Sequence, residues 1–179
     1  MTSERRVYTG FQQSRFDWSL ECGIIAERDI YPSLMNATKV ERFTGQKSFV
    51  DKEFGIDVLV TTGKGRQCAI AERFRGARYK RYQDLTIREE SLYNIGKALE
   101  VHKSIARYML YGYADVDQKD TQPPKCITQW LLVDLQPTID KYMAAKIPFG
   151  KKQNHDGSSC FIHITFDTLR SFSLVVAES

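Results

Sequence analysis

Residues 55–75 read GIDVLVTTGKGRQCAIAERFR, and this stretch decides the fold that the sequence predicts. Apolar and β-branched residues fill its two ends, at 55–60 and 67–75, and a short turn with two glycines lies between them at 61–66. Two such runs on either side of a glycine-containing turn are typical of a β-hairpin. We therefore predict two adjacent antiparallel strands joined by the 61–66 turn.

The pattern outside the hairpin alternates between helix and strand. Residues 12–31 have the spacing of an amphipathic helix that ends at Pro32, with an apolar stripe of Phe16, Leu20, Ile24 and Ile25. We expect further strands at 85–87, 105–113, 127–135 and 161–166, helices at 89–101 and 137–145, and loops at 114–125 and 150–159. This order predicts an α/β fold with a central mixed sheet flanked by helices. A length of 179 residues fits one domain that spans residues 1–179.

Composition limits the class of protein. Hydrophobic residues make up 42% of the chain and aromatic residues 12%, which excludes a disordered protein. The N-terminus has no secretory signal, and no apolar run is long enough for a membrane span, so we expect a cytoplasmic protein without a membrane partner. The four cysteines form no CxxC pair and are expected to be reduced and mostly buried.

A dense basic segment begins in the turn of the hairpin. Residues 64–81 hold seven cations and one acid, a local charge of +6, whereas the whole chain carries +4. Arginine and lysine neutralise phosphates, and the interleaved Tyr79 and Tyr82 could stack on bases or pack under arginine side chains. A solvated surface loop is the alternative. The residues predicted to contact nucleic acid are Lys64, Arg66, Arg75, Arg78, Lys80 and Arg81.

Two acids flank the predicted turn. Asp57 lies in an apolar run, and Glu72 lies on the partner strand. A carboxylate in such a place needs a partner or a function. If the turn pairs the two strands, both carboxylates come near one another, and together they could hold Mg²⁺ or Mn²⁺ beside a phosphate. The alternative is an ion-pair network of the two acids with Arg73 and Arg75.

This arrangement resembles the PD-(D/E)XK nuclease superfamily, whose fold is called restriction-endonuclease-like. A helix that bears Glu21 precedes a strand that begins with GID, as in Holliday-junction resolvases and small phage and viral members. The resemblance implies that Asp57 is the first metal ligand and that Glu21 is an additional one. On the second strand, Ala71 falls at the position of the motif's acid and Arg73 at that of its lysine, so Glu72 is displaced by one residue.

The displacement leaves more than one function open. Neighbouring residues of a strand face opposite sides, so Glu72 does not reach the metal side of a regular strand. We therefore predict that the strand bulges at Ala71 or Glu72, or that the Glu72 side chain reaches around the strand edge. With either arrangement, the resemblance implies a metal-dependent DNA endonuclease of the same restriction-endonuclease-like fold. Asp57, Glu72 and Arg73 would then be catalytic, and Asp57, Glu72 and Glu21 would bind Mg²⁺ or Mn²⁺.

Without either arrangement, the chain is expected to be a catalytically degenerate nucleic-acid-binding protein on the same fold. A third class is an interaction protein whose basic face meets an acidic protein. Many nucleases of this fold act as dimers, so a homodimer is among the expected forms.

Overall fold

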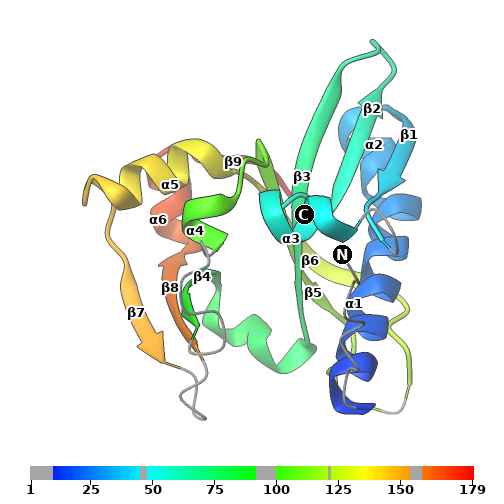
Figure 1. Cartoon of the computed structure of the whole chain (residues 1–179), viewed down its shortest axis with the longest axis horizontal. Coiled ribbons are helices and arrows are strands. Elements are labelled where there is room, and N and C mark those ends of the chain that lie inside the picture. Colours follow the sequence, from blue (N-terminus) through cyan, green and yellow to red (C-terminus); the bar gives the residue numbers. More distant parts are fainter. Residues whose placement is uncertain (1–9, 45–47, 92–99, 121, 154–158) are drawn as a thin grey trace, which may run out of the picture.

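The fold is built on one large mixed sheet with a smaller sheet beside it (Figure 1). The computed structural model describes residues 10–44, 48–91, 100–120, 122–153 and 159–179. The helices are α1 (Gly10–Asp29), α2 (Tyr31–Met35), α3 (Ser48–Phe54), α4 (Glu100–Lys103), α5 (Leu135–Met143) and α6 (Phe166–Ser171), and a 3-10 helix, η2, spans Ala77–Tyr82. The predicted α/β class with a mixed central sheet and flanking helices is confirmed.

The strands of the two sheets are interleaved along the chain. The six-stranded sheet has the order β1-β2-β3-β5-β6-β9 and contains β1 (Ala37–Arg42), β2 (Val58–Thr62), β3 (Gln67–Arg75), β5 (Tyr108–Ala114), β6 (Ile127–Asp134) and β9 (Val175–Glu178). The three-stranded sheet has the order β4-β8-β7 and contains β4 (Asp84–Ser91), β7 (Gly150–Gln153) and β8 (Ser159–Thr165). In the large sheet β3 and β5 are parallel, and every other pair is antiparallel.

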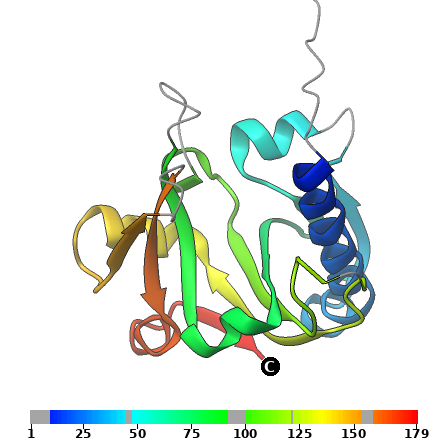
Figure 2. The same cartoon turned by 90° about the horizontal axis from the view of Figure 1, so that it is seen from below.

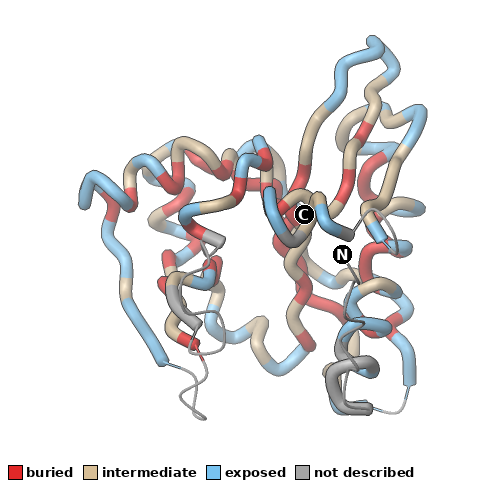
Figure 3. Tube along the Cα trace, viewed as in Figure 1, coloured by how far each residue is buried: buried red, intermediate tan, exposed pale blue. Residues whose placement is uncertain are grey.

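The predicted hairpin is confirmed. β2 and β3 pair antiparallel, with Val58 opposite Ile70. In the turn, Gly65 has φ 75° and donates its N–H to the carbonyl of Thr62 at 2.8 Å. Glycine adopts this left-handed backbone at little cost, which is why the turn closes in so few residues. The hairpin projects from the rest of the sheet, and its tip is exposed (Figures 1 and 3).

Each face of the large sheet is covered by a different layer (Figure 2). On one face α1 and α2 pack on β2, β3, β5 and β6 through a core that includes Trp18, Cys22, Val60, Ile70 and Leu132. On the other face lie β4, β8, α5 and α6, and that core includes Tyr111, Leu131, Leu135, Ile162 and Phe166. The alternation of β3 and β5 therefore supplies apolar side chains to both cores.

Of the predicted apolar stripe of the first helix, only Ile25 is buried, and the buried face as a whole is rotated by about half a turn. The residues of α1 that face the sheet include Trp18, Cys22 and Ile25, whereas Phe16 and Ile24 are 50% and 47% exposed. The indole at position 18 sets the buried face because it brings more apolar area than the side chains of the predicted stripe.

Helix α1 ends at Asp29, and Pro32 lies in the first turn of α2 rather than directly after α1. Proline suits a first turn because its missing N–H has no helical partner there.

Two other local predictions are wrong because pairing with β8 overrides local preference. Residues 89–91, predicted as helix, belong to β4, and residues 150–153, predicted as loop, form β7. The predicted helix is confirmed only at α4, since residues 92–99 lie outside the described residues, as do 154–158 of the predicted loop. The strands expected at 105–113, 127–135 and 161–166 and the helix at 137–145 are present within a few residues.

The four cysteines are free thiols, but only Cys22 is buried, and Cys126 is exposed, so the prediction that most are buried is wrong. No helix among the described residues is long and apolar enough to cross a membrane.

Candidate functional site

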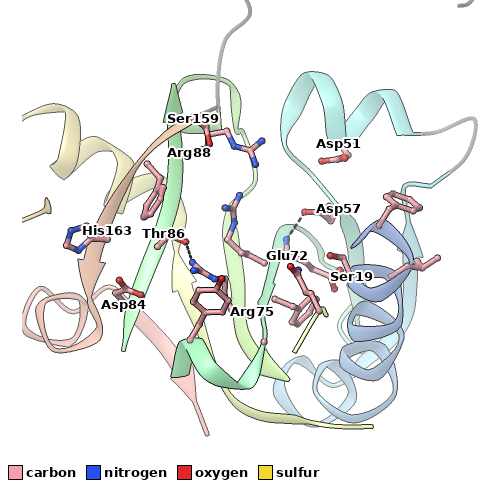
Figure 4. A pocket seen from close by; sticks show the side chains of 18 of the residues that line it. Ser19, Asp51, Asp57, Glu72, Arg75, Asp84, Thr86, Arg88, Ser159 and His163 are labelled. Carbon is pink, nitrogen blue, oxygen red and sulfur yellow. Dashed lines mark hydrogen bonds between the residues drawn. The ribbon is translucent and has the colours of Figure 1, made fainter. Parts of the chain in front are cut away.

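A cleft of about 670 Å³ opens at the carboxyl-terminal end of β3 (Figure 4). Its floor is the last part of β3, from Glu72 to Arg75. One wall comes from α1, β1 and α3, and the other comes from η2, β4, β7 and β8. The cleft therefore exists only when elements from most of the chain are assembled.

The floor is an open sheet edge. β2 pairs with β3 only as far as Ile70, while β5 follows β3 to Arg75. The carbonyl of Ile70 accepts the N–H of Asp57 at 3.0 Å, whereas the carbonyl of Ala69 accepts from Arg107, just before β5. Because backbone groups alternate along a strand, those of Glu72 point to the side that β2 has left.

Asp57 closes part of this edge. Its Oδ2 accepts the backbone N–H of Glu72 at 2.7 Å, in the place of a carbonyl from a neighbouring strand (Figure 4). The turn before it depends on Gly55, which has φ 62° and lies so close to Ser104 that an added Cβ would be 3.1 Å from its side chain. The sequence GID therefore brings a carboxylate to the edge through a glycine-dependent turn.

The carboxylate of Glu72 is directed away from the cations of the basic segment. Although Glu72 belongs to the cleft lining, its side chain is only 6% exposed and forms an ion pair with Arg42 of β1. The hydroxyl of Tyr31 donates to Glu72 Oε1 at 2.7 Å, and Arg42 also donates to the carbonyl of Gly23 at 2.7 Å. Burial raises the pKa of Tyr31 well above its usual range, and the Glu72 carboxylate raises it further, so the phenol remains a donor.

The predicted bulge is absent, and the Glu72 carboxylate does not reach around the strand edge either, since Arg42 and Tyr31 hold it. The pairing of β3 with β5 runs without a register shift from Ile70 to Arg75. Ala71 is buried in the core that contains β4 and β8, whereas Ile70 and Phe74 belong to the core that contains α1. Glu72 therefore follows Ile70 and Phe74 to the α1 side, as regular alternation requires.

The three predicted metal ligands do not fit one Mg²⁺ or Mn²⁺ ion. Mg²⁺ needs ligand oxygens at about 2.1 Å. Both oxygens of Glu72 are engaged by Arg42 and Tyr31, and Glu21 is exposed on α1 and outside the cleft lining. The described residues contain no group of three or more histidine, cysteine, aspartate or glutamate residues placed to hold a metal ion. Of the predicted set, only Asp57 has its carboxylate at the open edge of the cleft floor.

Arg73 and Arg75 lie on the face of β3 opposite to Glu72 and line the cleft. One nitrogen of Arg75 donates to Thr86 at 2.8 Å (Figure 4) and to the hydroxyl of Tyr111 at 3.3 Å. The same guanidinium lies over the ring of Tyr79, 4.3 Å from its centroid. The side chain of Arg75 is thus held against the wall that β4 and η2 form.

The remaining predicted contacts lie outside the cleft lining. Lys64 and Arg66 are exposed at the tip of the hairpin. On η2, Arg78 pairs with Asp117 at 3.4 Å, and Lys80 donates to a backbone carbonyl at 3.4 Å. The guanidinium of Arg81 lies 5.0 Å from the ring centroid of a neighbouring tyrosine.

Two cations that the sequence analysis missed complete the site. Arg88 of β4 and Lys152 of β7 are exposed and line the cleft. Leu85 and Ile87 are buried, so the two-residue alternation of this segment could have shown that Arg88 faces outward. No such signal exists for Lys152, because its placement depends on the pairing of β7 with β8.

The cleft combines cations, acids and aromatic rings. Its cations are Arg42, Arg73, Arg75, Arg88 and Lys152, its acids are Asp51, Asp57, Glu72 and Asp84, and its aromatic residues with six-membered rings are Phe16, Phe43, Phe74, Tyr79, Tyr82 and Phe161. Arg42 and Glu72 neutralise each other, so one cation and one acid of the lining contribute no net charge toward a ligand. A mixed lining of this kind can bind an anion and an aromatic group in adjacent positions.

Comparisons of the chain with protein-family models, with curated proteins and with solved structures returned no significant match. The functional conclusion therefore rests on the geometry of the cleft.

Proposed function

We propose that the protein binds nucleic acid in the cleft on β3 and does so without the metal centre expected of a PD-(D/E)XK nuclease. The observation that carries the proposal is the convergence of Arg73, Arg88 and Lys152 on one cleft from three different strands. Arginine and lysine bind phosphate oxygens with charge-assisted hydrogen bonds, and their attraction to a polyanion is long-ranged. A concave site also favours this function over a flat basic face that meets an acidic protein.

The position of Glu72 favours binding over cleavage. A second metal ligand would have to leave a nearly dry ion pair with Arg42 and cross to the other face of a regular strand. Leaving Arg42 buried without its partner costs about 3–5 kcal/mol. That cost opposes the rearrangement that a shared metal site with Asp57 requires.

Binding is tested by fluorescence anisotropy with labelled oligonucleotides over a range of salt concentrations. We expect an affinity that falls steeply with salt, and a smaller slope for Arg88→Ala than for the parent protein. Arg28→Ala is the matched control, because Arg28 is exposed on α1, pairs with Asp29 and lies outside the cleft lining. Equal losses in Arg88→Ala and Arg28→Ala would place the binding surface elsewhere.

Metal-dependent cleavage of DNA is the second candidate, and one observation favours it. Asp57 lies in the cleft lining together with Arg73, the position that the resemblance assigns to the motif's cation. Plasmid nicking in Mg²⁺ or Mn²⁺ tests this candidate. The best variant is Asp57→Asn, because its amide oxygen still accepts the N–H of Glu72 while the charge is lost. Nicking by the parent but not by Asp57→Asn, with binding preserved in both, would establish cleavage.

A further inference from the structure

The rim of the cleft carries an exposed aromatic ring. Tyr82, at the end of η2, is 48% exposed, although tyrosine rings usually bury most of their apolar area. The guanidinium of Arg81 and the ammonium of Lys152 lie 5.0 Å and 6.0 Å from its centroid. An exposed ring beside two cations, one from η2 and one from β7, is a suitable platform for a flat aromatic group that is attached to an anion.

The neighbouring tyrosine, Tyr79, is partly buried and packs against the core that contains β4 and β8. The rings of Tyr79 and Tyr82 lie 6.3 Å apart, and Tyr79 carries Arg75 at 4.3 Å and Arg78 at 5.2 Å. Tyr79 thus packs against the core and carries Arg75, whereas Tyr82 is the more exposed of the two rings.

We propose that the cleft takes a single-stranded segment of nucleic acid, with one base stacked on Tyr82 and the adjoining phosphates against Lys152 and Arg88. The proposal rests on the proposed function and names its substrate class. Stacking on an aromatic side chain requires a base whose face is free, and a base inside a duplex offers none.

The size and shape of the cleft favour the same substrate. Pockets of about 300–1,000 Å³ hold a ligand the size of one or two nucleotides, and this cleft measures about 670 Å³. A duplex is read by an element that projects into a groove, such as a helix or a two-stranded ribbon. The floor here is a recessed strand edge between two walls, a shape that suits a flexible strand better than a duplex.

The tip of the β2–β3 hairpin is the surface that a duplex would be expected to contact instead of the cleft. It does project, and it bears Lys64 and Arg66. If the ligand were a duplex, these two residues would be the natural contacts, and the cleft would contribute little. The two substrate classes therefore depend on different residues of the same protein.

The test measures the affinity of the full chain for DNA and RNA single strands and for the DNA duplex of the same sequence. We expect the single strands to bind more tightly than the duplex. Tyr82→Ala should weaken single-strand binding by about 5- to 150-fold, the range for loss of one stacked base, and Tyr82→Phe should restore it because the ring returns. A 2-aminopurine base in the strand should be quenched by the parent and not by Tyr82→Ala.

The matched control is Phe49→Ala, since Phe49 is 57% exposed and lies outside the cleft lining. This variant should bind as the parent does. Lys152→Ala should reduce the salt slope on single strands by about 0.7.

Two failures are distinguishable. If no nucleic acid binds in any form, the proposed function itself is wrong. If the duplex binds as tightly as the single strand, or if binding depends on Lys64 and Arg66 but not on Tyr82, the protein binds nucleic acid and only the single-stranded substrate is overturned. A preference for RNA or for DNA single strands identifies the sugar that the cleft accepts.

Discussion

Replacing Glu72 by alanine is expected to destabilise the fold by about 3 kcal/mol. The cations of the cleft that would bind nucleic acid should stay in place. The side chains of Glu72 and Arg42 are only 6% and 14% exposed. Removing one partner of a buried ion pair costs about 3–5 kcal/mol, because the other charge stays in a medium that solvates it poorly.

The lower end of that range applies because Arg42 keeps other partners. It still donates to the carbonyl of Gly23 at 2.7 Å and lies 3.9 Å from Glu27. The hydroxyl of Tyr31 loses its acceptor as well, but this loss is part of the same network and is not added separately. For a chain of this length, about 3 kcal/mol lowers Tm by about 6–12 °C.

The assay is thermal unfolding followed by circular dichroism, for Glu72→Ala, Arg42→Ala and the double variant. The double variant should lose less than the sum of the two single losses, since each single variant already breaks the same pair. Glu27→Ala is the control, because Glu27 is 44% exposed and lies 3.9 Å from the guanidinium. Its loss should stay within about 1 kcal/mol.

A Tm that falls by less than about 2 °C in Glu72→Ala would refute this reasoning, as would losses that simply add in the double variant. If such a variant also lost cleavage that the parent performs in Mg²⁺, Glu72 would be a metal ligand. The endonuclease would then replace the binding protein as the leading function.

Two further predictions concern stability. Gly65→Ala should cost about 1 kcal/mol in urea unfolding because alanine is strained at φ 75°, and Gly55→Ala should cost more, since its φ is 62° and a side chain lies 3.1 Å from the added Cβ. Burial alone would raise the pKa of Glu89, but hydrogen bonds from Lys151 and Tyr142 lower it below its ordinary value of 4.5. A carboxyl whose pKa is lowered by folding contributes stability above its unfolded pKa and loses it as pH falls through the folded pKa. The stability gap between the parent and Glu89→Gln, measured by unfolding in urea, should therefore be constant above about pH 5 and shrink below pH 4.5; a gap that widens on acidification would contradict the shift.

The parts of the fold that could be predicted are those that short-range chemistry decides. The hairpin at 55–75 depends on a glycine in its turn and on β-branched residues on either side, and both are visible in sequence. The same holds for α5, whose proline lies near its start. Strand β4 was expected as a strand, but its membership of the second sheet depends on β8, about 75 residues later, and no local pattern shows this.

The candidate site was predicted only where its residues are close in sequence. The sequence indicated Asp57, Arg73 and Arg75 as neighbours, and all three line the cleft. Glu72 was expected to pair with the nearby Arg73 and Arg75. Its partner is Arg42, thirty positions earlier, which reaches it because β1 lies beside β2 in the large sheet and α1 packs on that face.

The hydrogen bond from the N–H of Glu72 to Asp57 also limits aggregation through the open edge of β3. An open strand edge is a template on which another chain can add a strand, and this route leads to aggregation. The N–H of Glu72, which an incoming strand would need as a donor, already donates to a carboxylate at 2.7 Å. A foreign carbonyl would meet a negative charge there instead of a donor. One donor that strand addition by another copy would need is therefore blocked at the bottom of the cleft, where a ligand has room.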